Sequence, residues 1–72
     1  MTQTKLEQER KLIGMGFKIR RLSLFISARE LMEASENTLT IATIYKFERG
    51  GSSHGDTRVI YEYTIKKLET EI

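Results

Sequence analysis

The pattern of apolar and polar positions divides this chain into stretches of helical periodicity separated by polar runs. In the middle of the chain, Ser27 and Glu30 are spaced as a capping box, in which the hydroxyl accepts the N–H of Glu30 and the carboxylate accepts the N–H of Ser27. A helix is therefore predicted to begin at Ala28, with Leu31 and Met32 facing inward.

A second helix is predicted after a turn. The polar residues 35–38 interrupt the apolar spacing, and Thr40 can cap the helix that follows. In that helix Ile44 and Phe47 recur at helical spacing until Gly50, which suits a left-handed C-terminal position, ends it. Two helices joined in this way can place the second one in a groove.

A longer helix is predicted before this unit, with Thr2 or Thr4 as its cap. Its apolar positions are Leu6, Leu12, Ile13, Ile19 and Leu22. Gly14 and Gly16 mark either a kink or the close approach of another backbone, so residues 1–13 are set apart as an N-terminal helix or arm.

The remaining segments complete the predicted domain. Phe25 and Ile26 precede the capping box and are predicted to lie in the core or to staple the helix start. Asp56 or Thr57 can cap a C-terminal helix over residues 56–70. The apolar positions of this helix are Val59, Ile60, Tyr63, Ile65, Leu68 and Ile72.

These patterns predict a compact all-α domain of about four to five helices over residues 1–72, with a helix-turn-helix at 27–50. The predicted core residues are Leu22, Leu31, Ile44, Phe47, Ile60 and Leu68. Tyr61 and Tyr63 make the last helix more apolar than one face of a small core needs. Either another protein chain covers a second surface there, or these tyrosines are ordinary exposed residues.

Length and composition limit the chemistry. A chain of 72 residues is near the lower size at which a core folds without a disulfide or metal. There is no cysteine, and the single histidine, His54, lies in a glycine- and serine-rich loop without a partner at useful spacing. We expect no catalytic residue, metal, cofactor or small-molecule substrate. The short, charged apolar runs predict no membrane span, so a cytoplasmic protein is expected.

The net charge is +2, from 12 basic and 10 acidic residues, and the charges are unevenly placed. From position 10 to position 29 all charged residues are basic, and they are Arg10, Lys11, Lys18, Arg20, Arg21 and Arg29. Glu30, Glu33 and Glu36 then follow without a base. The pattern predicts a positive end and an adjoining negative face, which are either solvated helix faces or a nucleic-acid footprint.

The central unit resembles the Cro/CI repressor family of helix-turn-helix proteins. The residues that carry the resemblance are Ile26, Ser27, Leu31, Ile44, Phe47, Glu48, Arg49 and Gly50, and the ending IYKFERG is the most specific part. Residues 16–22 look like the first helix of that family, so the resemblance covers about residues 14–51. It implies a lambda-repressor-like fold.

The resemblance also implies two structural roles. A glycine stands near the start of the family's first helix, which favours a structural role for Gly16. The family's acid in the second motif helix is a structural partner, so Glu48 is predicted to pair with Arg20 or Arg21 across the helices.

Two functions follow from the resemblance, and both make the protein a transcription regulator of a bacteriophage lysis–lysogeny switch. In the first, the second motif helix binds a partner CI-type repressor, as an antirepressor or modulator of repression, with or without operator DNA. In the second, the chain is a Cro-like repressor that binds double-stranded operator DNA directly as a dimer. Phosphate contacts would then come from Lys18, Arg29, Lys46 and Arg49. The candidate binding residues for either function are Arg29, Thr40, Ile41, Ala42, Thr43, Tyr45, Lys46 and Arg49.

Partner binding is favoured by the start of the second motif helix. DNA readers usually carry Gln, Arg, Lys, Asn or Ser there, whereas this chain has Ile41 and Ala42. These side chains can touch a thymine methyl but cannot form the bidentate hydrogen bonds that discriminate bases, and they suit a protein partner better. A third alternative, an antitoxin, predicts a disordered tail, but the tail here has helical apolar spacing.

Overall fold

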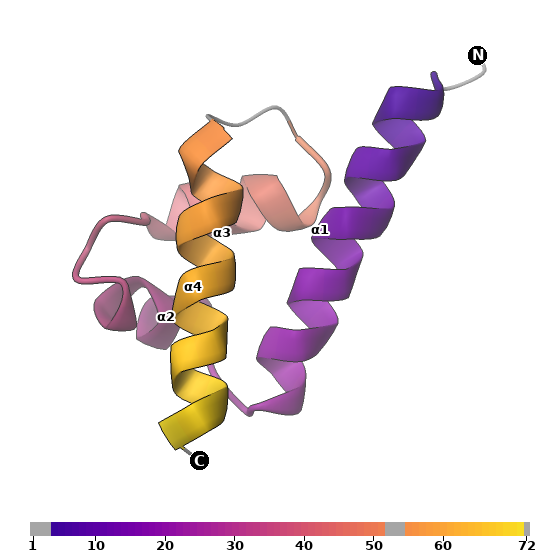
Figure 1. Ribbon diagram of the computed structural model, residues 1–72. Helices are drawn as coiled ribbons and strands as arrows, with labels where there is room; N and C mark the ends of the chain where they lie inside the picture. The colour runs from indigo at the N-terminus through magenta and orange to yellow at the C-terminus, as the bar shows by residue number, and fades with distance from the viewer. Residues whose placement is uncertain (1–3, 52–54, 72) are drawn as a thin grey trace.

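The computed structural model describes residues 4–51 and 55–71, which form four helices (Figure 1). They are α1 (Lys5–Ser23), α2 (Ala28–Ala34), α3 (Ile41–Glu48) and α4 (Gly55–Glu71). Because the described residues contain no strand, the predicted all-α class is confirmed. Thr2, His54 and Ile72, which carried predictions from the sequence, lie outside the described residues.

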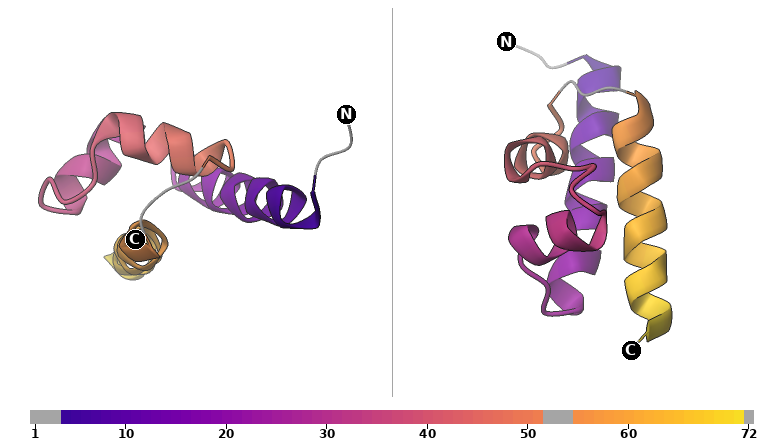
Figure 2. Two further views of the ribbon diagram at one scale, coloured as in Figure 1. Left: turned by 90° about the horizontal axis from the view of Figure 1, so that it is seen from above. Right: turned by 90° about the vertical axis from the view of Figure 1, so that its left-hand side faces the viewer.

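Helix α3 packs against each of the other three helices, and so does α4. The long helices α1 and α4 run in the same general direction, and the short helices α2 and α3 lie beside them (Figure 2). The side of α3 that faces the domain is therefore covered by α1, α2 and α4 together.

Capping side chains explain where three of the helices begin. The Thr4 hydroxyl accepts a backbone N–H of the first turn of α1 at 3.2 Å. Before α2 the capping box is complete, with Ser27 Oγ accepting the N–H of Glu30 at 3.1 Å and Glu30 Oε1 accepting the N–H of Ser27 at 3.2 Å. Thr40 caps α3 by accepting the N–H of Thr43 at 3.1 Å. The predicted starts of α2 and α3 are confirmed.

The predicted polar turn joins α2 to α3. Glu36 and Asn37 take left-handed backbone conformations, with φ of 58° and 63°. The Ser35 hydroxyl donates to the Met32 carbonyl at 2.7 Å and accepts the N–H of Leu39 at 3.1 Å, so the turn pairs polar groups that would otherwise be buried alone. Leu39 is fully buried, although helical spacing does not identify it.

Three aromatic rings form the middle of the core. Phe17 of α1, Phe47 of α3 and Tyr61 of α4 have ring centroids 5.3–5.6 Å apart in every pairing. The other buried apolar residues are Ile26, Ala28, Leu31, Leu39, Ile44 and Ile65. Each helix therefore contributes to a single contiguous core.

Most of the predicted core is confirmed. The confirmed residues are Leu31, Ile44 and Phe47, which are buried, and Ile60 and Leu68, which are partly buried against the core. Leu22 is 51% exposed, so its prediction was wrong. The buried residues of α1 are Gly14, Phe17 and Arg21, and Leu22 lies on another side of the helix. Of the apolar positions predicted for α1, Ile13 packs against the core, whereas Leu6, Leu12, Ile19 and Leu22 are exposed.

The linker between α1 and α2 separates two residues that were predicted together. Ile26 is buried, as expected, but Phe25 is 92% exposed. Phe25 has a left-handed backbone with φ of 57°, and its N–H donates to the Leu22 carbonyl at 3.0 Å. This tight turn sends the Phe25 ring into solvent and Ile26 into the core, so the prediction for Phe25 was wrong.

Gly14, and not Gly16, has the packing role. A Cβ at Gly14 would lie 2.4 Å from the carbonyl oxygen of Phe47 and 2.7 Å from that of Glu48, so glycine is needed for α3 to approach α1. A Cβ at Gly16 would meet no heavy atom within 4 Å, which contradicts the structural role predicted for Gly16. Helix α1 continues through both glycines, so residues 5–13 are not a separate arm.

The segment around the last loop agrees with the sequence in part. Gly50, after α3, has the predicted left-handed conformation with φ of 81°. Helix α4 begins at Gly55, so Asp56 and Thr57 lie inside its first turn and are not its cap. Within the described residues, no helix combines the length and the apolar character needed to cross a membrane.

Candidate docking surface on helix α3

Helix α3 carries most of the predicted binding residues, and burial separates its two faces. Ile44, Phe47 and Glu48 point into the domain and are buried. The other face is exposed; we call it the α3 strip, and it consists of Ile41, Ala42, Tyr45 and Lys46. Ile41 is 36% exposed and Tyr45 is 47% exposed, so the strip presents apolar surface to solvent.

A buried ion pair fixes α3 to α1. Arg21 Nε donates to Glu48 Oε2 at 2.7 Å, and Arg21 Nη2 donates to Glu48 Oε1 at 3.0 Å. Arg21 Nη1 donates to the Ile26 carbonyl at 2.9 Å, and the Tyr61 hydroxyl of α4 donates to Glu48 Oε2. The predicted pairing of Glu48 is confirmed for Arg21, while Arg20 pairs with an acid of α4.

Burial and hydrogen bonding set the protonation states in this network. Burial raises the pKa of Tyr61, and the hydrogen bond to Glu48 raises it further. The hydrogen bond from Arg21 to Glu48 raises the pKa of the guanidinium, although desolvation opposes this. Tyr61 is therefore a neutral donor and Arg21 a cation well above neutral pH. The network ties α1, α3 and α4 together and holds the α3 strip in one orientation.

The start of α3 offers few groups that could read bases. The Thr40 hydroxyl accepts the N–H of Thr43 and donates to the Thr43 hydroxyl at 2.8 Å, so it is engaged in capping. Ile41 and Ala42, which follow it, have no hydrogen-bonding side chain. In direct readout, this end of the helix is the part that contacts base edges.

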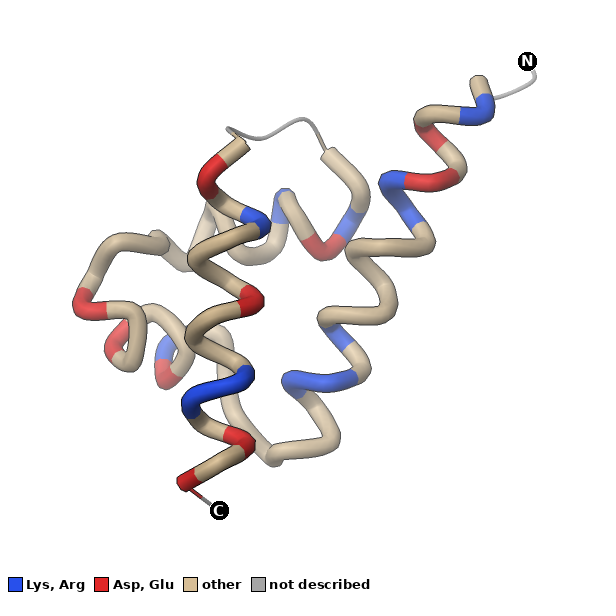
Figure 3. Tube along the Cα trace, viewed as in Figure 1, with Lys and Arg blue, Asp and Glu red and all other residues tan. Residues whose placement is uncertain are grey.

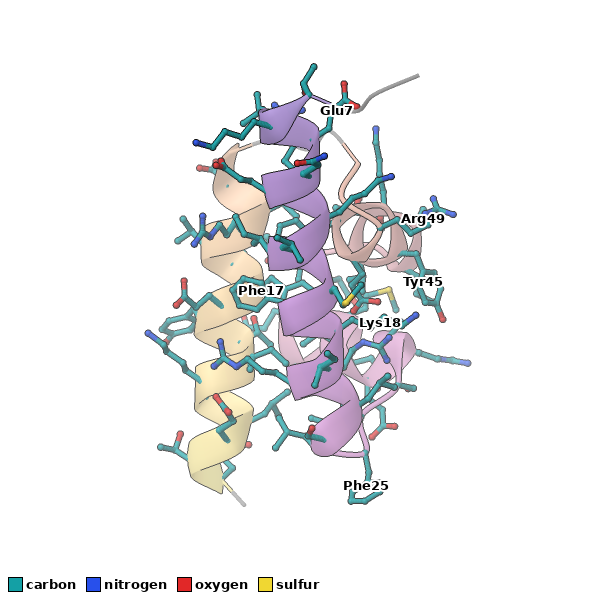
Figure 4. All side chains as sticks on the ribbon, turned by 90° about the vertical axis from the view of Figure 1, so that its right-hand side faces the viewer. Glu7, Phe17, Lys18, Phe25, Tyr45 and Arg49 are labelled. Atoms are coloured by element: carbon teal, nitrogen blue, oxygen red, sulfur yellow. The ribbon has the colours of Figure 1, made fainter. Side chains whose placement is uncertain are left out.

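A basic hollow lies between α1 and the C-terminal end of α3. Its volume is about 260 Å³, and its lining residues are Lys11, Met15, Lys18, Glu48 and Arg49. Because Glu48 is bound to Arg21, the charge left at the rim is positive. Figure 4 shows Lys18 of α1 projecting on the same side of the molecule as Tyr45 of α3 and Arg49, which follows α3.

Part of this surface was predicted from the sequence. Lys18 and the α3 residues were named as binding candidates, whereas Lys11 was named only as part of the basic run and Met15 was not named; both recur with Lys18 at i, i+4 and i+7 on one face of a helix. That spacing could have identified them. Arg29 does not line the hollow, and its Nε lies 3.4 Å from Glu33 Oε1 on the exposed side of α2.

The backbone trace shows how the charges are distributed (Figure 3). Charged positions in the second half of α1 are all basic, whereas α2 and the turn after it carry Glu30, Glu33 and Glu36. Arg21 is buried and paired with Glu48, so it adds no charge to the surface. The surface charge beside α3 therefore comes from the lysines of α1 and from Arg49.

No group of three metal-ligating side chains is present in residues 4–51 and 55–71. Comparisons with known protein families, with curated proteins and with solved structures find no match to this chain. The resemblance to the Cro/CI family therefore stays a prediction from the residues.

Proposed function

We propose that this protein regulates transcription in a temperate-phage lysis–lysogeny switch by docking the α3 strip onto a partner CI-type repressor, as an antirepressor or modulator of repression. The apolar character of the strip is the observation that supports this best. A helix-turn-helix protein presents its base-reading helix at this place. Ile41 and Ala42 offer no hydrogen bond to a base edge there.

The packing of α3 also favours a docking role. Phe47 and Glu48 anchor the helix in the core, so the strip is ordered before any partner arrives and little freedom is lost on binding. Tyr45 still has half of its surface to bury. Truncating an aromatic residue at the centre of an interface costs on the order of 2 kcal/mol or more.

Co-purification with the CI-type repressor of the same switch tests the proposal. The test variant carries Ile41→Glu and Tyr45→Ala. The matched control carries Val59→Glu and Tyr63→Ala, which place similar changes on α4, where both residues are more than half exposed. Circular dichroism should show native helix content for both variants, because neither loses a core side chain.

We expect the α3 variant to bind the repressor at least about 30-fold more weakly, which corresponds to one lost anchor of about 2 kcal/mol. The α4 control should bind as the natural chain does. If the α3 variant co-purifies with the repressor as well as the natural chain does, the α3 strip is an ordinary solvated helix face and the proposal is wrong.

Direct operator binding is a second candidate function, and the basic hollow favours it. Lys18, Lys46 and Arg49 form no ion pair within the described residues, so they are free to neutralise phosphates. Affinity would then fall steeply with salt, and Lys46→Ala would flatten the slope by about one unit. We expect weak DNA binding at most. Nanomolar operator binding by the isolated chain at physiological salt would contradict the partner-dependent function.

A further inference from the structure

The outward face of α1 carries a row of apolar residues that the fold does not use. The row consists of Leu12, Met15, Ile19 and Leu22, and each is more than half exposed. The buried residues of α1, Gly14, Phe17 and Arg21, lie on the opposite side of the helix. Single exposed apolar residues are normal, but a row of adjacent ones usually marks an interaction site. We call this row the α1 seam.

The spacing of the seam is that of a helix-pairing surface. Its residues are separated by three, four and three positions, which is the a/d pattern of a heptad repeat with Leu12 and Ile19 at a and Met15 and Leu22 at d. A strict two-row pattern of this kind is narrower than the apolar face of a helix that packs on a globular core. It fits a second helix that lies along α1.

Basic residues flank the α1 seam on both sides. Lys11 and Lys18 occupy the g positions, directly before Leu12 and Ile19, and both line the basic hollow beside α3. On the other side, a second hollow of about 260 Å³ reaches from the seam toward α4, and its lining residues are Leu12, Ile13, Gly16, Phe17, Arg20 and Arg58.

Most of the basic residues beside the α1 seam have no acidic partner in the described part of the chain. Arg20 pairs with Glu69 at 2.7 Å, but Lys11, Lys18 and Arg58 have no ion pair within residues 4–51 and 55–71. The acids of α1, Glu7 and Glu9, precede the seam along the helix. In Figure 4, α1 stands nearest the viewer with its outward face open, and Lys18 projects along the α3 side.

We propose that the α1 seam is a docking site for an amphipathic α-helix of another protein, one whose apolar row is flanked by Asp and Glu. The apolar rows would interlock, and the acids would face Lys11 and Lys18. Gly16, at an e position with open space around it, would let the partner's backbone approach closely. The site is separate from the α3 strip, so it goes beyond the proposed function and does not depend on it.

Charge argues against a second copy of this chain as the occupant. In an antiparallel pair of α1 helices, g positions face g positions, so Lys11 and Lys18 would oppose the same lysines of the other copy. In a parallel pair they would face Gly16 and Ser23 at e positions, which offer no opposite charge. A lipid surface suits a wider apolar face than two rows.

A pair of synthetic peptides tests the assignment. Each is about three heptads long with leucine at a and d; one carries glutamate at e and g, and its twin carries lysine. Like charges at e and g keep each peptide from pairing with itself. Binding to the full chain is measured by fluorescence anisotropy, and amide chemical shifts of the labelled protein locate the contact.

We expect the acidic peptide to bind at least about tenfold tighter than its basic twin, with shifts confined to the outward face of α1. The Leu12→Gln, Ile19→Gln variant should lose this binding while keeping its helix content, and Val59→Gln on α4 should keep it. A Lys11→Glu, Lys18→Glu variant should reverse the preference between the peptides. The charge-reversed variant keeps the apolar residues of the α1 seam, so it tests the proposal even if the glutamine variant fails to fold.

Several results would overturn the proposal. These are equal or absent binding of the two peptides, an unchanged preference in the charge-reversed variant, and shifts that map to α3 or α4. Self-association of the natural chain that Ile19→Gln abolishes would assign the seam to a second copy. Adsorption to phosphatidylserine vesicles, with no peptide binding, would assign it to a membrane. None of these results depends on whether the α3 strip binds a repressor.

Discussion

Replacing Glu48 with alanine should destabilise the domain by about 3–5 kcal/mol, because it leaves a buried guanidinium without its counter-charge. Arg21 and Glu48 are each only 5% exposed, so water cannot take over the lost contacts. The carboxylate accepts two hydrogen bonds from Arg21 and one from Tyr61. A domain of this length is stabilised by roughly 4–11 kcal/mol in total. The loss should therefore be a large part of the free energy that stabilises the domain.

Urea unfolding followed by circular dichroism measures this loss. A double-mutant cycle with Arg21→Met and Glu48→Leu supplies the control, since the double variant removes both charges and keeps apolar volume. We expect it to lose at least about 2 kcal/mol less than the sum of the single changes. A loss below about 1 kcal/mol for Glu48→Ala, or an additive cycle, would refute the view that this ion pair fixes α3 to α1.

Three further predictions concern the core and its network. Phe47→Ala should cost about 3–5 kcal/mol in urea unfolding, whereas Leu22→Ala should cost less than about 1 kcal/mol; similar losses would contradict the observed burial. Gly14→Ala should lower the melting temperature because its Cβ would overlap α3, while Gly16→Ala should raise stability by about 0.5–1 kcal/mol through helix propensity; the reverse order would be inconsistent with the packing. Because the pKa of Tyr61 is raised from 10.0 in the folded state, its contribution is intact below pH 10.0 and is lost as pH rises above it. Tyr61→Phe should remove this alkaline loss, and unchanged alkaline curves would contradict it.

The helix starts and the turn within residues 27–50 could be predicted from local sequence signals. Ser27 with Glu30, and Thr40, are capping residues whose hydrogen bonds depend only on the next turn of chain, so the starts of α2 and α3 could be predicted. The polar turn and the left-handed position of Gly50 are equally local. Such features need no knowledge of the tertiary fold.

The orientation of α1 could not be predicted in this way. The helix has apolar residues on two faces, and the buried face contains Gly14 and Arg21, which binary patterning counts as neutral or polar. Arg21 is buried because Glu48, far away in the sequence, balances its charge. Periodicity therefore pointed to Leu22, and only tertiary contacts identify the face that packs.

The candidate site could be predicted only in part, because part of it depends on tertiary contacts. The α3 strip follows from helical spacing around Ile44 and Phe47, which face inward. The basic hollow joins residues of α1 to Arg49, which follows α3, and that neighbourhood depends on how the two helices pack. Helical spacing identifies which residues share a face of a helix, but it does not specify what binds to that face.

Titration of a repressor–operator complex with this protein, followed by mobility shift, tests directly whether the α3 strip acts on the repressor. We expect the isolated chain to leave operator DNA unshifted at physiological salt. Docking through the α3 strip requires that the natural chain alters or releases the repressor band, and that the Ile41→Glu, Tyr45→Ala variant leaves this band unchanged. A band shifted by the protein alone at nanomolar concentration, or a repressor band altered equally by the variant, would contradict the proposed function.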